Sequence, residues 1–205
     1  MFQRTLLSGV MIGSMVLLLS ACATPTTYVD PRDDRGRATM TLDYRDFEMA
    51  AGEAVDSMLL SGAVDNPHGG RYILAVSRVT NDTMQRLDTD QLTRKIRVEL
   101  LNSGRVVTTT AVGIDGPEDE MSMRVRELRD SAEFDQSGVQ RQGTLQAPDL
   151  SLSGKIMQRN HRVDRRTQQI DYYFQLALTD LETGLAIWET EVPIIKRGSN
   201  RSVGW

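Results

Sequence analysis

The segment Ile170-Asp-Tyr-Tyr-Phe-Gln-Leu-Ala-Leu178 decides the fold. Its large apolar residues recur at every second position, and this period of two predicts a β-strand with one covered face. Residues 150–156 alternate in the same way. Residues 180–184 predict a hairpin loop, from which residues 185–192 return as another strand. The last third of the chain is therefore expected to form an antiparallel meander.

Two amphipathic helices and two strands are predicted upstream of the meander. Apolar residues at helical spacing predict one helix that Asp43 caps and Ser61-Gly62 ends, and a second between Asp88 or Thr89 and Gly104. The apolar run 71–79 predicts a central strand, and the β-branched residues 105–111 predict a parallel neighbour.

A third helix is expected to open at residues 116–120, whose acidic side chains suit the start of a helix. Its expected apolar stripe consists of Met121, Val125, Leu128 and Ala132. The predicted order is α-β-α-β-α-β-β-β. The sequence therefore predicts an α/β (α+β) fold with a single mixed β-sheet flanked by helices.

The N-terminal region predicts a secreted, lipidated protein. Arg4 precedes an apolar run of about 14 residues, which is shorter than the roughly 20 residues of a membrane-spanning helix. The run ends in Leu18-Leu-Ser-Ala-Cys22, which resembles a bacterial lipobox, and Cys22 is the single cysteine. We therefore predict a signal peptide over residues 1–21 and lipidation of Cys22. Because Ala23 rather than Asp follows the cysteine, the pattern favours the outer membrane, on its periplasmic side.

Residues 22–39 are predicted to form the lipidated cysteine and a flexible tether, and residues 40–205 a globular domain. The tether is rich in Pro, Asp and Arg and shows no apolar period. The 17 residues from Ala23 to Thr39 span at most roughly 60 Å when extended. The composition of the whole chain, with 205 residues, 40% hydrophobic and 25% charged, is typical of one domain with tails.

The sequence contains no motif for enzyme chemistry. The phosphate-binding and dinucleotide-binding glycine patterns and the G-x-S-x-G pattern are absent, and the chain has only two histidines, His68 and His161. The formal net charge of −4 gives no general attraction to nucleic acid. We therefore expect no catalytic residues, no metal site, no cofactor and no nucleic-acid partner.

A cluster of arginines suggests a surface for a protein partner. Residues 159–169 carry four Arg and one His, and they are predicted to form a projecting hairpin turn. Arginine clusters bind phosphate or acidic protein faces. The alternatives are that the arginines lie in a solvated loop without a partner and that Tyr173 is buried. The residues that we predict to bind a partner are Arg159, Arg162, Arg165 and Tyr173.

Several segments together resemble the LpoB family of outer-membrane lipoproteins. They cover nearly all of residues 40–205, in order: Leu42-Asp-Tyr-Arg-Asp-Phe47, Gly69-Gly-Arg-Tyr-Ile73, Thr80-Asn-Asp-Thr83, Gln85-Arg-Leu-Asp-Thr-Asp-Gln-Leu92, Leu100-Leu-Asn-Ser-Gly104, Ala147-Pro-Asp-Leu-Ser-Leu-Ser-Gly-Lys-Ile156, Tyr172-Tyr-Phe-Gln-Leu176, Thr183-Gly184 and Trp188-Glu189. The resemblance implies a fold similar to the N-terminal domain of TolB.

The resemblance also implies a function. LpoB-like proteins activate a bifunctional class A penicillin-binding protein of the 1B type. They dock on its regulatory domain, which lies between the glycosyltransferase and transpeptidase domains. The implied protein is a monomer that stimulates glycan polymerisation and cross-linking without catalysing a reaction. The tether of this chain is shorter than the long arm typical of the family. The alternative is a structural lipoprotein of an envelope assembly, such as a flagellar or secretion collar.

Overall fold

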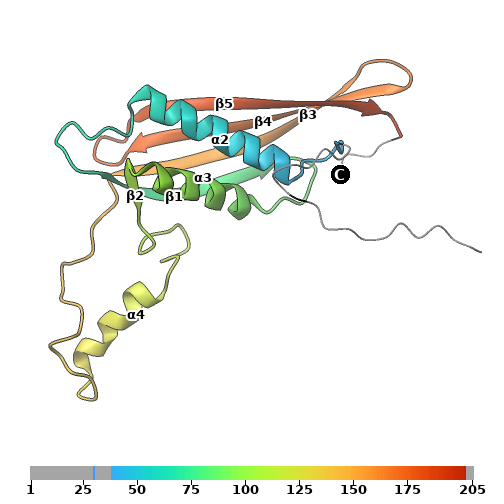
Figure 1. The fold of residues 1–205 in the computed structure, drawn as a ribbon. Helices are drawn as coiled ribbons and strands as arrows, with labels where there is room; N and C mark the ends of the chain where they lie inside the picture. The colour runs from blue at the N-terminus through green and yellow to red at the C-terminus, as the bar shows by residue number, and fades with distance from the viewer. Residues whose placement is uncertain (1–29, 31–37, 202–205) are drawn as a thin grey trace, which may run out of the picture. The chain divides into compact units, whose positions relative to one another are not determined.

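The structure is a computed structural model that describes residue 30 and residues 38–201 (Figure 1). The elements in chain order are α2 (Tyr44–Ser61), β1 (Tyr72–Asp82), α3 (Thr89–Ser103), β2 (Val106–Thr108), α4 (Met121–Glu127), the 3-10 helix η2 (Leu128–Asp130), β3 (Leu150–Arg162), β4 (Thr167–Asp180) and β5 (Ala186–Ser199). This order confirms the predicted succession of helices and strands.

The strands form one mixed sheet in the order β2-β1-β3-β4-β5. β1 runs parallel to both β2 and β3, whereas β3, β4 and β5 form an antiparallel meander. The predicted parallel neighbour of β1 and the predicted meander are therefore confirmed. In β1 the consecutive residues Leu74, Ala75 and Val76 are all buried, as expected for an interior strand.

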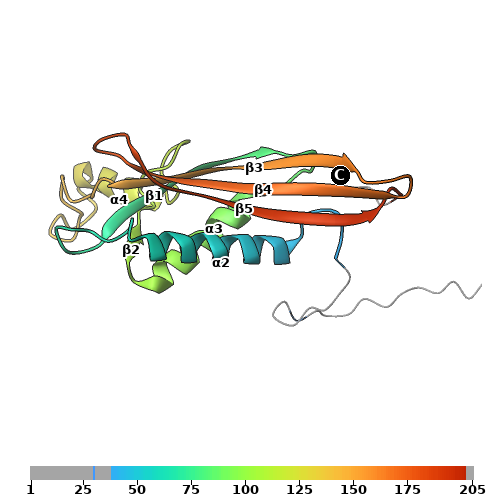
Figure 2. The same ribbon diagram turned by 90° about the horizontal axis from the view of Figure 1, so that it is seen from above.

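Helices α2 and α3 lie side by side on one face of the sheet (Figure 2). The alternation in β4 places Ile170, Tyr172, Phe174, Leu176 and Leu178 on this covered face, where all five are buried. The ring of Phe174 meets that of Phe47 from α2 edge to face, with centroids 5.9 Å apart. The core therefore lies between the meander and the two helices.

The opposite side of the sheet, here called the open face, carries the other set of alternating side chains. The strand register places on it Lys155, Met157, Arg159 and His161 of β3 and Asp171, Tyr173 and Gln175 of β4. Apart from Asp171, each of these residues is partly or fully exposed.

The ends of α2 and α3 follow the predicted caps. The side chain of Asp43 accepts a hydrogen bond from Arg45 N, and that of Asp88 accepts one from Asp90 N. Gly62 and Gly104 end the helices in the left-handed conformation, with φ of 75° and 69°. Glycine adopts this conformation without the steric cost that a side chain brings.

The predicted third helix differs from the structure. α4 begins after the acidic residues, at Met121, and has only seven residues. None of them is buried, and Met121 is 57% exposed, so the expected apolar stripe covers nothing. The physical reason is that α2 and α3 already cover the apolar face of the sheet, and α4 lies apart from them in the segment between β2 and β3 (Figure 1).

Several strand lengths were also predicted wrongly. β2 has three residues instead of the seven in 105–111, because it pairs only with the first residues of β1. β1 continues to Asp82, three residues beyond the predicted strand 71–79. β3 and β4 extend into the expected loop of residues 159–169, and only four residues, 163–166, form the turn. Cross-strand pairing thus lengthens the meander strands beyond their apolar alternation.

Candidate docking surface and tether attachment

The β3–β4 hairpin has an ordered turn. Oδ1 of Asp164 accepts hydrogen bonds from the backbone N of Arg166 and Thr167, at 2.7 and 2.8 Å. These bonds, of which that from Arg166 is the stronger, hold the pKa of Asp164 below its usual value. Because Asp164 turns its charge toward the backbone, the arginines beside it are presented on a fixed loop.

The four predicted partner-binding residues lie on different sides of this hairpin. Arg159 pairs with Asp171, two residues along each strand from the Met157–Tyr173 pair, so Arg159 and Tyr173 share the open face. Arg162 pairs with Gln168 and belongs to the other face, and Arg165 lies in the turn. The three arginines are exposed, and Tyr173 is half-buried. The structure therefore places the three arginines at one end of the sheet, on both faces and in the turn, whereas Tyr173 lies near the middle of β4.

This end of the molecule, here called the hairpin end, consists of residues 159–169 and 196–201. It contains six exposed arginines against one Asp, in a chain whose net charge is −4. Lys196 also belongs to these segments, but its side chain is only 10% exposed. Asp171 adjoins it but is buried, with Oδ2 lying 3.0 Å from Nε2 of His161 and Oδ1 accepting a hydrogen bond from Gln169. The hairpin end is therefore a basic surface.

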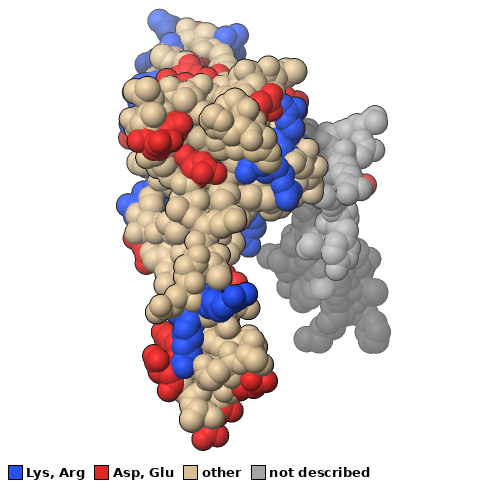
Figure 3. All heavy atoms as spheres, turned by 90° about the vertical axis from the view of Figure 1, so that its left-hand side faces the viewer, with Lys and Arg blue, Asp and Glu red and all other residues tan. Residues whose placement is uncertain are grey.

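The opposite end of the molecule, which faces the viewer in Figure 3, mixes charges of both signs. Arg105 forms an ion pair with Asp65 there, and Arg124 forms one with Glu120. Because these charges neutralise one another, this end has no extended surface of one charge sign, in contrast to the hairpin end.

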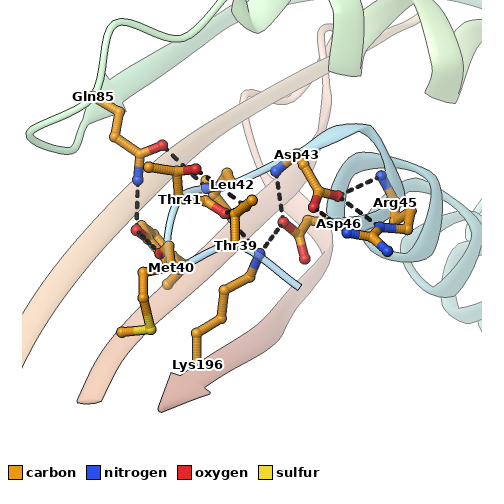
Figure 4. Close-up of polar contacts among 10 residues, drawn as sticks. Thr39, Met40, Thr41, Leu42, Asp43, Arg45, Asp46, Gln85 and Lys196 are labelled. Atoms are coloured by element: carbon orange, nitrogen blue, oxygen red, sulfur yellow. Dashed lines mark hydrogen bonds and ion pairs between the residues drawn. The ribbon is translucent and has the colours of Figure 1, made fainter. Parts of the chain in front are cut away.

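The chain enters the domain at the hairpin end through a buried hydrogen-bond network (Figure 4). The hydroxyl of Tyr172 donates to Met40 O at 2.9 Å and accepts a hydrogen bond from Nε2 of Gln85. Oε1 of Gln85 accepts from Leu42 N at 3.1 Å. Burial raises the pKa of Tyr172 to about 12, so the hydroxyl keeps its proton and its donor role.

A second set of contacts fixes the same segment from β5. Nζ of Lys196 donates to Thr41 O at 2.7 Å and to Oδ2 of Asp46 at 2.6 Å. The same carboxylate oxygen accepts from Asp43 N at 2.7 Å, which completes the capping box of α2. The side chains of Lys196 and Asp46 are only 10% and 11% exposed. The network ties residues 40–42 to β4, β5 and the first turn of α2.

Sequence reasoning did not find this attachment. The alternation predicts that Tyr172 is buried, but it does not name a partner for the hydroxyl. Gln85 lies in a polar segment, and Lys196 lies beyond the predicted end of its strand. A buried tyrosine requires a hydrogen-bond partner, and this was the one available signal.

The remaining residues singled out in the sequence form no further site within residues 38–201. His68 is exposed, and Trp188 is buried in the core. Within residues 38–201, no group of three or more His, Cys, Asp or Glu side chains is arranged to hold a metal ion. None of the helices in that range has the length and apolar content needed to cross a bilayer. Cys22 and Trp205 lie outside the described residues.

Comparisons with known proteins identify the family. The family model described as peptidoglycan-synthase activator LpoB matches residues 46–194. No curated protein sequence matches the chain. The solved LpoB C-terminal domains of Escherichia coli and Salmonella enterica are each 19% identical, with a TM-score of 0.43, covering 73% of this chain and 98% of theirs. The solution structure of E. coli LpoB is 16% identical, with a TM-score of 0.38, covering 88% of this chain and 85% of its own.

The region matched by the family model runs from the first turn of α2 into β5 and thus includes both helices of the core and the whole β3–β4 hairpin. On this evidence the chain belongs to the LpoB family of peptidoglycan-synthase activators.

Proposed function

We propose that the protein binds a class A penicillin-binding protein of the 1B type and stimulates its glycan polymerisation and, with it, cross-linking. The match of the LpoB family model over residues 46–194 carries this proposal. The protein itself catalyses no step in the proposal. It works as a ligand of the synthase's regulatory domain.

The proposed docking surface consists of the hairpin end, with Arg159, Arg162 and Arg165, and of Tyr173 on the adjoining open face. Arginine and tyrosine are enriched among the residues that dominate binding energy at protein interfaces. The exposed guanidinium groups of a basic surface attract an acidic partner face and speed the encounter. The turn that Asp164 orders means that little conformational entropy is lost when the partner binds.

Activation follows from differential affinity. A ligand shifts a conformational equilibrium of its partner only to the extent that it binds one state more tightly than the other. A domain with a continuous sheet and a buried core keeps its own shape, so its binding energy is available to stabilise the polymerising state of the synthase.

The proposed location is the periplasmic side of the outer membrane, with Cys22 lipidated. Acyl chains contribute about 0.8 kcal/mol for each buried CH2 group, so several chains give lasting attachment. The domain is proposed to act as a monomer at the end of the tether.

The test is a glycan-polymerisation assay with purified synthase and the full-length chain in detergent. We expect stimulation by the wild type, and at least about tenfold weaker binding by a variant with Arg159→Glu and Arg165→Glu, because like charges then oppose the partner face. Arg71→Glu, at the other end of the sheet, is the matched control and should bind normally.

The possible outcomes test the activator function and the proposed docking surface separately. Absence of stimulation by folded wild type contradicts the activator function. Normal binding by the double variant contradicts the docking surface alone. Light scattering of the same preparation should report a monomer, whereas a stable ring would point to a structural collar.

A further inference from the structure

A polar cavity of about 440 Å3 lies between β1, the N-terminal half of α3 and the loop of residues 113–118. It is on the covered side of β1, away from the hairpin end, so the proposed docking surface does not use it. Its volume is within the range of small-molecule sites in proteins, which is about 300–1,000 Å3.

Two arginines one helical turn apart on α3 supply the cavity with hydrogen-bond donors that are not fully used. Nη2 of Arg97 lies 2.6 Å from the carboxylate of Glu118 in the loop. Nε of Arg97 is buried and has no hydrogen-bond partner within the part of the chain that the structure describes. Arg94 lines the same cavity and makes no hydrogen bond or ion pair among those residues.

An unsatisfied buried N–H group costs about 1–3 kcal/mol, and the cost is removed when an acceptor reaches it. Because Nε of Arg97 is closed to solvent, a ligand reaches it only when the loop of residues 113–118 or the Arg97 side chain shifts. A guanidinium group presents its donors in a planar fork that matches a carboxylate. The second guanidinium nearby adds charge. The cavity is therefore suited to the carboxylate of a ligand.

The lining also contains acidic groups that point to a second feature of the ligand. The ionisable residues of the cavity are Arg78, Arg94, Arg97, Asp90, Asp115 and Glu118. Arg78 and Asp115 are 3.5 Å apart and highly exposed, so their pairing is weak and both remain available. A ligand with a carboxylate for the arginines and an amine for Asp90 and the weakly paired Asp115 satisfies both signs.

We propose that this cavity binds a short zwitterionic peptide of the kind found in peptidoglycan stems, with its carboxylate on Arg94 and Arg97. The volume holds about two or three amino-acid residues. The choice of a peptidoglycan peptide rests on the proposed function. The expectation that the ligand is zwitterionic rests on the charges of the cavity alone. Such binding would let the activator respond to the polymer whose synthesis it stimulates.

The test is a titration of the full-length chain in detergent micelles, without synthase, followed by NMR of backbone and arginine Nε–H signals. The probe is the tripeptide L-alanyl-γ-D-glutamyl-meso-diaminopimelate. We expect saturable shifts of the Arg97 Nε–H signal and of the loop 113–118. Arg94→Gln should weaken binding about tenfold, as the loss of one charge-assisted hydrogen bond predicts.

Two further variants sharpen the result. Arg97→Lys keeps a charge opposite Glu118 but removes Nε, and it should also weaken binding. Arg71→Gln, an exposed arginine outside the cavity, should leave binding unchanged. Absence of shifts, equal binding by Arg94→Gln, or equal shifts with acetate alone would overturn the assignment. Since synthase is absent, none of these outcomes bears on whether the chain activates it.

Discussion

At the scale of single residues, Tyr172 connects the core to residues 40–42, which precede α2. Its ring is fully buried, while its hydroxyl bonds Met40 and Gln85. Tyr172→Phe keeps the ring and leaves a carbonyl and an amide without their partner. We expect a loss of about 1–3 kcal/mol in the free energy of unfolding at neutral pH, measured by urea denaturation.

The same residue predicts a dependence of stability on pH. The pKa of Tyr172 is raised from 10.0 to about 12 by burial, so above pH 10 the unfolded chain releases a proton that the folded chain retains. The stabilisation is therefore complete below pH 10 and is lost as the pH rises towards 12. The difference in unfolding free energy between wild type and Tyr172→Phe should shrink over this window. A constant difference would contradict the raised pKa.

Lys196 gives a second prediction at this scale. Lys196→Met leaves the carboxylate of Asp46 buried without its cation, and breaking such a pair typically costs about 3–5 kcal/mol. Adding Asp46→Asn should recover part of the loss, because the amide oxygen still accepts from Asp43 N. Lys155→Met is the control, since its partner Asp82 is half exposed and solvent screens the pair, so this variant should lose little stability. Equal losses in the two single variants would contradict the buried pairing.

How far the sequence predicts individual residues depends on the kind of signal. Asp43, Asp88 and Gly104 act locally, within one helical turn, so their caps could be read directly. The partners of Tyr172 and Lys196 come from segments more than 80 residues away in the chain, and no local pattern encodes them. The hairpin arginines were identified from charge alone, which does not tell on which face of a strand each one lies.

At the scale of elements, Gly154 marks the closest approach of β3 to β4. A Cβ atom there would lie 2.6 Å from Gln175 O and 2.5 Å from a methyl carbon of Leu176. Gly154→Ala therefore forces the strands apart, and we expect a loss of about 1–3 kcal/mol. Gly52 in α2 has open space around it, so Gly52→Ala should instead stabilise by about 0.5–1 kcal/mol. Urea denaturation of both variants checks the opposite signs.

The segment between β2 and β3 supports another prediction. Thr108 and Leu150 both pair with Leu74, one on each side of β1, so they are only about 10 Å apart. No residue from 111 to 147 is buried. Replacing residues 111–147 with a linker of about ten Gly and Ser residues should therefore leave a cooperative transition with Tm within about 5 °C of wild type. Circular dichroism would show a broad, non-cooperative transition if the core needs this segment.

Which elements could be predicted from the sequence depends on whether their apolar faces are covered. Alternation in β3 and β4 and the apolar stripes of α2 and α3 reflect burial against one another, and this pattern is visible in the sequence. The stripe of α4 has the same period but no surface to cover, because period alone does not reveal whether an apolar face meets a partner. The hairpin strands were underestimated, since their outer pairs are held by backbone hydrogen bonds between polar residues.

At the scale of the whole molecule, the sequence predicted the mixed sheet and the meander, but not the way the two ends of the sheet differ. The six exposed arginines of the hairpin end come from two segments, 159–169 and 196–201, that only the antiparallel pairing of β4 and β5 brings together. The cavity beside α3 likewise requires the loop of residues 113–118 to fold back, as its ion pair with Arg97 shows.

The attachment of residues 40–42 at the hairpin end sets a limit on distance. If that end carries the docking surface, and if Cys22 is lipidated in the outer membrane as proposed, the tether alone bridges the distance from the membrane to the proposed regulatory domain. The length of the folded domain then contributes nothing to that distance. About 17 extended residues cover no more than roughly 60 Å. Within that distance, a short tether would keep the local concentration of the activator high. Even a modest intrinsic affinity would then keep the synthase occupied.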